Sequence, residues 1–287
     1  QGLGVDALGV NCSLGPKELI PIVEEISKWT TVPIVVKANA GLPDPVTNTY
    51  NVLPDEFADT CKEMVKYGAK VLGGCCGTTP AYVAKLKEMV ATVNASVVKK
   101  KPRQLAVCTP LKTVVVDQPR IVGERINPTG KKRFKQALRD NDMNYILSQA
   151  IEQIDAGADI LDVNVGSPDI DEKEMMVKVI KALQAIVDVP LQIDSTKPEV
   201  LEAALRVYNG KPIVNSVNGE EEVLDTILPI VAKYGGAVIG LALDENGIPP
   251  TAEGRVEIAK RIRDKAMSYG IPKEDIIIDC LTLTASA

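Results

Sequence analysis

The sequence predicts an α/β fold in which parallel strands alternate with helices, and for residues 120–287 it favours a (β/α)8 barrel over an open, doubly wound sheet. Short apolar segments alternate with segments of helical periodicity from Asp6 onward, without a signal for tight hairpins. Residues 32–38 are almost continuously apolar, which is typical of a strand covered on both faces. Strand after strand ends in a carboxylate or an amide. A barrel collects such groups at one end, whereas an open sheet collects its ligands at one switch point.

Residues 1–95 contain three predicted strand–helix units. The strands cover residues 6–11, 32–38 and 70–72, and a proline stands near the start of each following helix. Cys61 lies on the apolar face of the second helix, so it is predicted to be a core residue and is not assigned to a site. The side chains expected to face the core are Leu19, Ile22, Val23 and Ile26, then Phe57, Cys61, Met64 and Val65, then Val83, Leu86, Val90 and Val93.

Residues 96–119 are predicted to connect two domains. This stretch is polar and punctuated by prolines, and its run Lys99-Lys100-Lys101 is interpreted as a solvated linker. Cys108 lies in the connector without a thiol partner nearby, so it is not assigned to a site. Residues 120–287 resume the alternation, with six strands predicted at residues 120–125, 159–164, 190–194, 212–215, 237–242 and 276–279.

Three cysteines at strand ends form a candidate metal site. Cys75 and Cys76 follow a strand and are bracketed by glycines, and Cys12 follows the first strand in a similar way. Three thiolates on neighbouring strand ends, with an open fourth position, are typical of a catalytic zinc site and would suit a thiol substrate. The alternative is that these are ordinary small buried residues, because free cysteine is among the most buried residue types.

Carboxylates and amides at the ends of the later strands form a second candidate site. Each of them could instead cap the following helix, and Asp194 with Ser195 is the best candidate for a cap. The repetition of this pattern over six strands favours a shared ligand site. The residues are Glu124, Asn127, Asp162, Asn164, Asp194, Asn215 and Asp279.

The composition argues against several classes of function. The 287 residues are 45% hydrophobic and 25% charged, and the formal net charge of -5 argues against a general nucleic-acid binder. No apolar segment approaches the length of a membrane span. Six cysteines, two of them adjacent, fit metal binding in a reducing compartment better than disulfides, so we expect a cytoplasmic protein. The chain has no histidine, so any acid–base chemistry falls to carboxylates, amides, water or a metal.

The motifs Asn11-Cys12 and Gly73-Gly74-Cys75-Cys76-Gly77-Thr78, together with Gly123-Glu124-Arg125-Ile126-Asn127-Pro128-Thr129-Gly130, resemble those of the cobalamin-dependent methionine synthase family. The resemblance covers essentially the whole chain. It implies two TIM barrels in tandem, both incomplete here, the first supplying its last three strands and the second its first six. It also implies that Cys12, Cys75 and Cys76 hold zinc (Zn²⁺), which keeps the homocysteine sulfur as a thiolate nucleophile. Asn39 would occupy the fourth position when substrate is absent.

For residues 120–287 the resemblance implies a pterin-binding barrel that takes 5-methyltetrahydrofolate. Asp194, Asn215 and Asp279 would hydrogen-bond the ring and assist catalysis, and the other strand-end residues, Glu124, Asn127, Asp162 and Asn164, would line the same mouth. Cobalamin, as methylcobalamin on a module that this chain lacks, would carry the methyl group to homocysteine. Two alternatives stay open. One is a methyltransferase that feeds another corrinoid protein with a different acceptor, and the other is a zinc-stabilised binding module without turnover.

Overall fold

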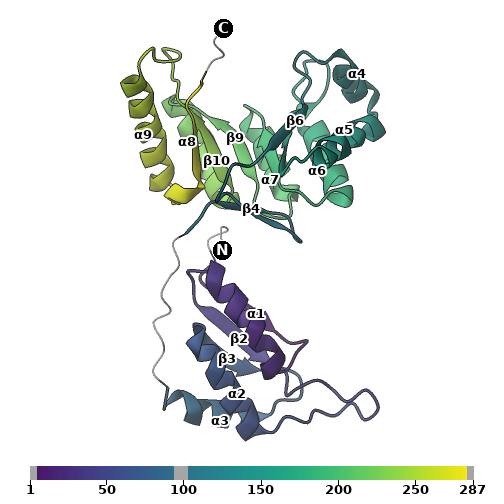
Figure 1. The fold of residues 1–287 in the computed structure, drawn as a ribbon, viewed down its shortest axis with the longest axis vertical. Coiled ribbons are helices and arrows are strands. Elements are labelled where there is room, and N and C mark those ends of the chain that lie inside the picture. Colours follow the sequence, from purple (N-terminus) through teal and green to yellow (C-terminus); the bar gives the residue numbers. More distant parts are fainter. Residues whose placement is uncertain (1–4, 94–102, 283–287) are drawn as a thin grey trace. The chain divides into compact units, whose positions relative to one another are not determined.

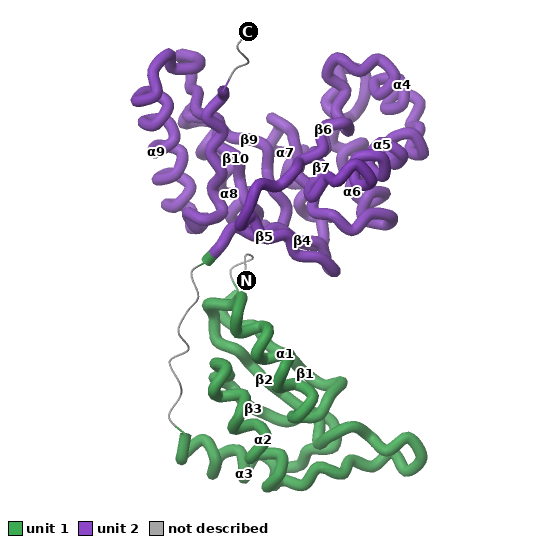
Figure 2. Tube along the Cα trace, viewed as in Figure 1, with its two compact units in different colours: residues 1, 3–103 green, residues 2, 104–287 purple. Residues whose placement is uncertain are grey.

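The computed structural model describes residues 5–93 and 103–282, and the chain divides into two compact units (Figure 2). Unit 1 comprises Leu3–Arg103 and unit 2 comprises Gln104–Ala287. Each unit is an α/β structure built around a parallel sheet. Within the described ranges, no helix is both long and apolar enough to span a membrane. The run Lys99-Lys100-Lys101, interpreted above as a solvated linker, lies outside the described residues.

Unit 1 is a three-stranded parallel sheet in the order β1-β2-β3, with a helix after each strand (Figure 1). Each helix has a proline in its first turn, where the missing N–H and the fixed φ are tolerated best. Asn11 pairs with Lys37, and Lys37 pairs with Gly73, so the carboxyl ends of the three strands meet at one edge. The elements are β1 (Leu8–Asn11), α1 (Pro16–Trp29), β2 (Ile34–Ala38), α2 (Pro54–Lys66), β3 (Ala69–Gly74) and α3 (Pro80–Val90).

The core of unit 1 forms between β2 and the helices. Phe57, Cys61 and Met64 of α2 are fully buried, as the sequence predicts. The ring of Phe57 meets that of Tyr82 edge-on, with centroids 5.4 Å apart. Burial of these apolar side chains is what fixes α2 and α3 against the sheet.

The predicted inward face of α3 is wrong in part. Val83 and Val90 are 54% and 46% exposed, because they line an apolar groove along β3, which is an edge strand. The buried face of α3 is made by Tyr82, Leu86 and Met89. The two faces are both apolar, so helical spacing alone does not distinguish them.

Unit 2 is built around a six-stranded parallel sheet whose neighbours follow chain order from β6 to β11. All six predicted strands form, and consecutive neighbours are what a (β/α)8 barrel requires. Among the described residues β6 and β11 are the sheet's edges, so the barrel is not closed here. The elements are β4 (Ala106–Cys108), β5 (Thr113–Val115), β6 (Val122–Ile126), α4 (Lys132–Asp140), α5 (Met143–Asp155), β7 (Ile160–Val163), α6 (Glu172–Ile186), β8 (Leu191–Asp194), α7 (Pro198–Val207), β9 (Ile213–Val217), α8 (Glu221–Tyr234), β10 (Ala237–Leu241), α9 (Ala252–Ser268), the 3-10 helix Lys273–Asp275 and β11 (Ile276–Asp279).

The predicted connector contains an antiparallel hairpin, β4–β5, that the sequence does not predict. Val107 and Val114 on its inner face are buried against the first residues of three sheet strands, Ile160, Ile213 and Ala237. Backbone hydrogen bonds in both directions, each 3.0 Å, join Cys108 to Lys211. The hairpin therefore covers the amino-terminal end of the sheet, and the polar strand ends lie at the opposite end.

Candidate functional site

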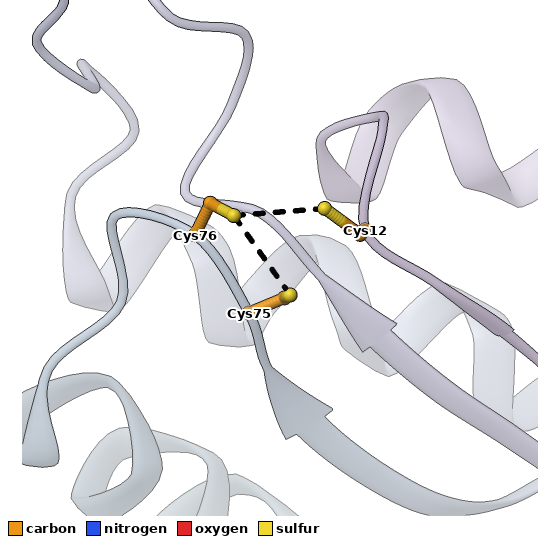
Figure 3. A group of neighbouring side chains, drawn as sticks. All are labelled: Cys12, Cys75 and Cys76. Carbon is orange, nitrogen blue, oxygen red and sulfur yellow. Dashed lines mark hydrogen bonds between the residues drawn. The ribbon is translucent and has the colours of Figure 1, made fainter.

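The three predicted cysteines lie together at the carboxyl edge of the unit 1 sheet (Figure 3). Cys12 follows β1, and Cys75 and Cys76 follow β3. The chain turns sharply at both places. Cys12 has a left-handed backbone with φ 68°, which is uncommon outside glycine, and Gly77 has φ 78°. Figure 3 shows the three thiols converging, with the Cys76 sulfur linked to the other two.

The spacing of the sulfur atoms fits a single metal ion. Cys76 Sγ lies 3.5 Å from Cys12 Sγ and 4.0 Å from Cys75 Sγ, and all three lie within 4.8 Å of one another. Two sulfurs bound at about 2.3 Å to one tetrahedral zinc would be about 3.8 Å apart. Within the described ranges no further cysteine or carboxylate joins this group, so the three thiols would supply three ligands to a zinc ion held here.

The thiols perturb one another's protonation. The backbone N–H of Ser13, followed by the thiols of Cys76 and Cys75, lowers the pKa of Cys12. Hydrogen bonding with Cys12 and then with Cys75 raises the pKa of Cys76. Cys12 therefore loses its proton more easily than Cys76, because neighbouring donors stabilise the Cys12 thiolate.

Asn39, the residue expected to fill the fourth position on zinc, follows β2 and hydrogen-bonds to the cluster. Its side chain is 4% exposed, and its Oδ1 accepts the backbone N–H of Cys76 at 3.0 Å. Its side chain also hydrogen-bonds the Cys12 thiol, which contributes to the lowered pKa of that group. Asn39 therefore holds parts of two cysteines in place, with one lone pair of its oxygen already engaged.

Tyr50 is a residue at this site that the sequence does not reveal. It comes from the proline-rich loop between β2 and α2, and its ring lies directly against Gly77, where an added Cβ would come within 2.3 Å of Tyr50 Cγ. Burial, followed by the charge and hydrogen bonding of Cys76, raises the pKa of Tyr50. The only sequence signal is that it is the sole aromatic residue between Trp29 and Phe57.

Four of the predicted polar residues in unit 2 form two hydrogen-bonded pairs, with three of them on β7, β8 and β9 and Asn164 directly after β7. Asn164 Nδ2 donates to Asp194 Oδ2 at 2.9 Å, and Asn215 Nδ2 donates to Asp162 Oδ1 at 3.2 Å. Gln192 Nε2 donates to the same Asp162 oxygen at 2.6 Å. Gln192 was not predicted, although it lies two residues before Asp194 and so faces the same side of the strand.

The remaining predicted residues take different positions. Glu124 on β6 is exposed, and its Oε2 lies 3.0 Å from Lys131 Nζ in an ion pair. The charge of Glu124 nevertheless contributes to the raised pKa of Asp162 and of Asp194. Asn127 is buried in a turn in which its Oδ1 accepts the N–H of Thr129 at 2.8 Å. Asp279 is exposed at the end of β11 and is separated from Asn215 by strand β10. Within the described ranges, no hydrogen bond joins Asp279 to the pairs on β7 to β9.

Burial makes the two central carboxylates of this site unusually basic. Asp162 is 2% exposed, and burial together with the charge of Asp194 raises its pKa to about 6, against the opposing effect of Gln192 and Asn215. Burial also raises the pKa of Asp194. Raised carboxyl pKa values at convergent strand ends are typical of functional sites.

The alternative role of Asp194 as a helix cap does not hold. Helix α7 begins at Pro198 with Lys197 as its N-cap residue, and no side-chain cap bond is made there. Ser195 donates to Glu172 Oε1 at 2.6 Å, and Lys197 pairs with the other oxygen of Glu172 at 2.9 Å. Glu172 was not predicted, and nothing in its sequence position distinguishes it from an ordinary first-turn acid of α6.

Comparison with known proteins matches each half of the chain to a family. A family model described as "Pterin binding enzyme" matches residues 123–287, which contain all the polar strand ends. The chain belongs to the pterin binding enzyme family. The model "Homocysteine S-methyltransferase" matches residues 1–90, which contain the three cysteines.

Two curated relatives match almost the entire chain. The methionine synthases of Mycobacterium leprae and Mycobacterium tuberculosis are each 34% identical over 99% of it. The resemblance to methionine synthase that the motifs indicate is thereby confirmed. The chain spans about a quarter of the length of these relatives, 25% in both cases.

Solved structures of dihydropteroate synthases are more distantly similar. The enzyme from Xanthomonas albilineans with 4-aminobenzoic acid has a TM-score of 0.47 and 23% identity, covering 61% of this chain and 64% of that one. The enzyme from Yersinia pestis with a pterine-sulfa conjugate has a TM-score of 0.47 and 19% identity over the same shares.

Proposed function

We propose that this chain carries two half-reactions of methionine synthesis, in which a methyl group passes from 5-methyltetrahydrofolate by way of cobalamin to homocysteine. Residues 1–95 and 120–287 would each be part of a (β/α)8 barrel, joined through residues 96–119. The observation that carries the proposal is the convergence of three thiols in the part of the chain that matches homocysteine S-methyltransferases. The reaction would take place in the cytoplasm, where thiolate ligands stay reduced.

In unit 1, Cys12, Cys75 and Cys76 would hold zinc, which supplies a Lewis acid that keeps a thiol substrate deprotonated at neutral pH. Asn39 has a separate task, because its hydrogen bond to the Cys76 backbone holds the turn after β3. The ring of Tyr50 packs against Gly77 in that turn and would help to hold its shape. The open side of the cluster is where homocysteine would enter.

In unit 2, Asp194, Asn215 and Asp279 would orient the pterin ring, with Glu124, Asn127, Asp162 and Asn164 around the same mouth. The match of residues 123–287 to pterin binding enzymes supports this assignment. N5 of 5-methyltetrahydrofolate is a poor leaving group unless it is protonated during transfer. The chain has no imidazole acid, so the proton would come from water or through hydrogen bonds, with Asp194 or Asp279 favouring the charged ring electrostatically.

The proposal is tested by separating the half-reactions in the intact protein. Asp194→Asn should slow methyl transfer from 5-methyltetrahydrofolate to cobalamin at least about tenfold, because it removes a charge that orients the ring. It should leave the methylation of homocysteine nearly unchanged. Cys75→Ser should have the opposite effect. If either substitution impairs both half-reactions equally in a folded protein, the division of labour between the two units is wrong.

The number of sulfur ligands around zinc distinguishes a catalytic zinc site from a structural one. X-ray absorption should show one zinc with three sulfur neighbours, and the sulfur count should rise when homocysteine is added. Cys108→Ser is the matched control, since this thiol lies on β4 in unit 2 and should not affect zinc content. A sulfur count that does not rise would point to a zinc-stabilised module without turnover.

A further inference from the structure

The hydrogen bonds around Asp162 determine which way two amide groups face. Asp162 and Gln192 are directly paired in the register of β7 and β8, and Asn215 reaches the same carboxylate from β9. An ionised carboxylate only accepts hydrogen bonds, so both amides must turn their NH2 groups towards Asp162. The negative charge of Asp162 therefore fixes the orientation of the Asn215 side-chain amide.

This orientation leaves the oxygen of Asn215 available to a ligand. Asn215 is half-buried, and among the described residues no donor lies within hydrogen-bond distance of its Oδ1. This oxygen is not one of the buried polar atoms that lack a partner. The oxygen is thus accessible to solvent. Asp194 lies opposite Asn215 in the strand register, and only its Oδ2 is occupied, by Asn164. The ends of β8 and β9 therefore present hydrogen-bond acceptors side by side.

A ring that binds across these acceptors must offer donors. The pyrimidine edge of a pterin carries a 2-amino group and an N3–H, which are both donors. A lumazine has a carbonyl oxygen in place of the 2-amino group, so it would set an acceptor against an acceptor. Two acceptors that face each other in a buried site both lose their hydrogen bonds to water, so this arrangement weakens binding more than the loss of one apolar contact would.

We propose that Gln192 and Asp162 are positioning residues, which hold the Asn215 amide with its oxygen towards the ligand and so select a ring edge that donates hydrogen bonds. This deepens the proposed function and rests on it, because it concerns the same pterin site. Asp162 acts through Asn215, since it is 2% exposed and one of its oxygens already accepts two amides. Gln192 is 7% exposed and acts through Asp162.

Protonation of Asp162 gives the proposal a readout that packing alone would not change. Burial and the charge of Asp194, with a smaller effect of Glu124, raise its pKa to about 6, and the bonds from Gln192 and Asn215 oppose the rise. A protonated Asp162 can donate, so it no longer forces the orientation of Asn215. The preference for the donor edge should fall as the pH drops through the pKa of Asp162. Removing the Gln192 donor should raise the pH at which this preference falls, because a hydrogen bond that stabilises the ionised Asp162 is lost.

The experiment compares 6-methylpterin with 6-methyllumazine by calorimetry in the intact protein, between about pH 5 and pH 8. The wild type should prefer the pterin at pH 7.5 and lose part of this preference on acidification. Gln192→Met should reduce the preference about fivefold and raise the pH at which it is lost. Asp162→Asn should remove the part of the pH-dependent change that comes from Asp162, because an amide does not titrate in this range.

Gln184→Met is the matched control. Its amide bonds the backbone of Ile180, Val207 and Asn209, away from the carboxyl ends of the strands, so preference and pH profile should stay as in the wild type. If both probes bind the wild type equally, or if Gln192→Met keeps the wild-type preference and pH profile, the positioning role is wrong while the pterin site stands. If neither probe binds, the proposed pterin function fails and the positioning role with it.

Discussion

Asp162 is a carboxylate that the fold buries almost completely without a cationic partner at hydrogen-bond distance among the described residues. Its pKa of about 6 lies above the ordinary value of 3.8, so folding favours the protonated form. Its contribution to stability is therefore fully present below about pH 4 and is lost as the pH rises through about 6. Ionisation at neutral pH opposes folding, which is consistent with a residue kept for function and not for stability.

Replacing Asp162 by Asn should accordingly change how stability depends on pH. Between about pH 4 and pH 8 the mutant should gain roughly 3 kcal/mol of unfolding free energy relative to the wild type, because it has no charge to bury. Urea unfolding at several pH values measures this difference. Asp169→Asn, on an exposed ion pair with Arg139, is the control and should shift stability by less than about 1 kcal/mol. A pH-independent difference for Asp162→Asn would contradict the assigned pKa.

Gly77 is the residue on which the shape of the cysteine turn depends. A side chain there would need φ 78° and would meet the ring of Tyr50, so Gly77→Ala should destabilise the turn by about 1–3 kcal/mol and weaken zinc binding. Gly130 has φ 71° but no atom within 4 Å of an added Cβ, so Gly130→Ala has the backbone strain without the clash. Zinc content after dialysis should fall for Gly77→Ala alone. Equal retention in both variants would show that Tyr50 does not constrain the turn.

The sequence predicts some of these residues and not others for a physical reason. Cys12 and Cys75 stand at strand ends of unit 1, and Asp162 and Asp194 stand at or near strand ends of unit 2. Parallel connections bring such side chains together at one edge of each sheet, so each of the two groups follows from the fold class. Tyr50 reaches the thiols from a long loop whose path no periodicity describes. The role of Gln192 depends on the register of β7 and β8, which places it opposite Asp162 and which the sequence does not predict.

Among the elements, the hairpin β4–β5 shows how a connector can belong to a core. Val107 and Val114 are buried on the first residues of β7, β9 and β10, so the hairpin shields apolar strand ends that would otherwise face water. The sequence did not predict it, because its strands are only three residues long and its turn contains Pro110. The helices were easier to predict, since each presents several turns of apolar spacing.

Val107→Ala should therefore destabilise unit 2 by about 2–3 kcal/mol, through lost burial and the cavity left behind. Leu111 in the turn of the same hairpin is 87% exposed, so Leu111→Ala should change stability by less than about 0.5 kcal/mol. Urea unfolding followed by the far-ultraviolet signal would measure both. Zinc binding in unit 1 should be unaffected by either change, and an equal effect of the two variants would show that the hairpin is not a core element.

Both parallel sheets of the molecule have edge strands without a further strand paired to them among the described residues. Strand β3 has an unpaired edge beside an apolar groove, and β6 and β11 are the edges of the larger sheet. The six strands of unit 2 follow one another in chain order, which is the order that a barrel requires and that the repeated strand–helix alternation predicts. Closure depends on contacts between strands far apart in sequence, and those are not encoded in any local pattern.

Expressed as these 287 residues alone, the protein should aggregate or form a loose oligomer, because unpaired parallel edges and half-exposed apolar side chains favour association. Light scattering after size-exclusion chromatography, followed by a thermal melt, tests this. Val71 lies on the edge strand β3 and is 52% exposed, so Val71→Lys should reduce association by placing a charge on the open edge, without changing zinc content. Lys87→Arg on the rim of the same groove keeps the charge and should leave association unchanged. A monomer that melts cooperatively would show that these edges are covered in solution, and the groove along β3 would then be an ordinary surface feature.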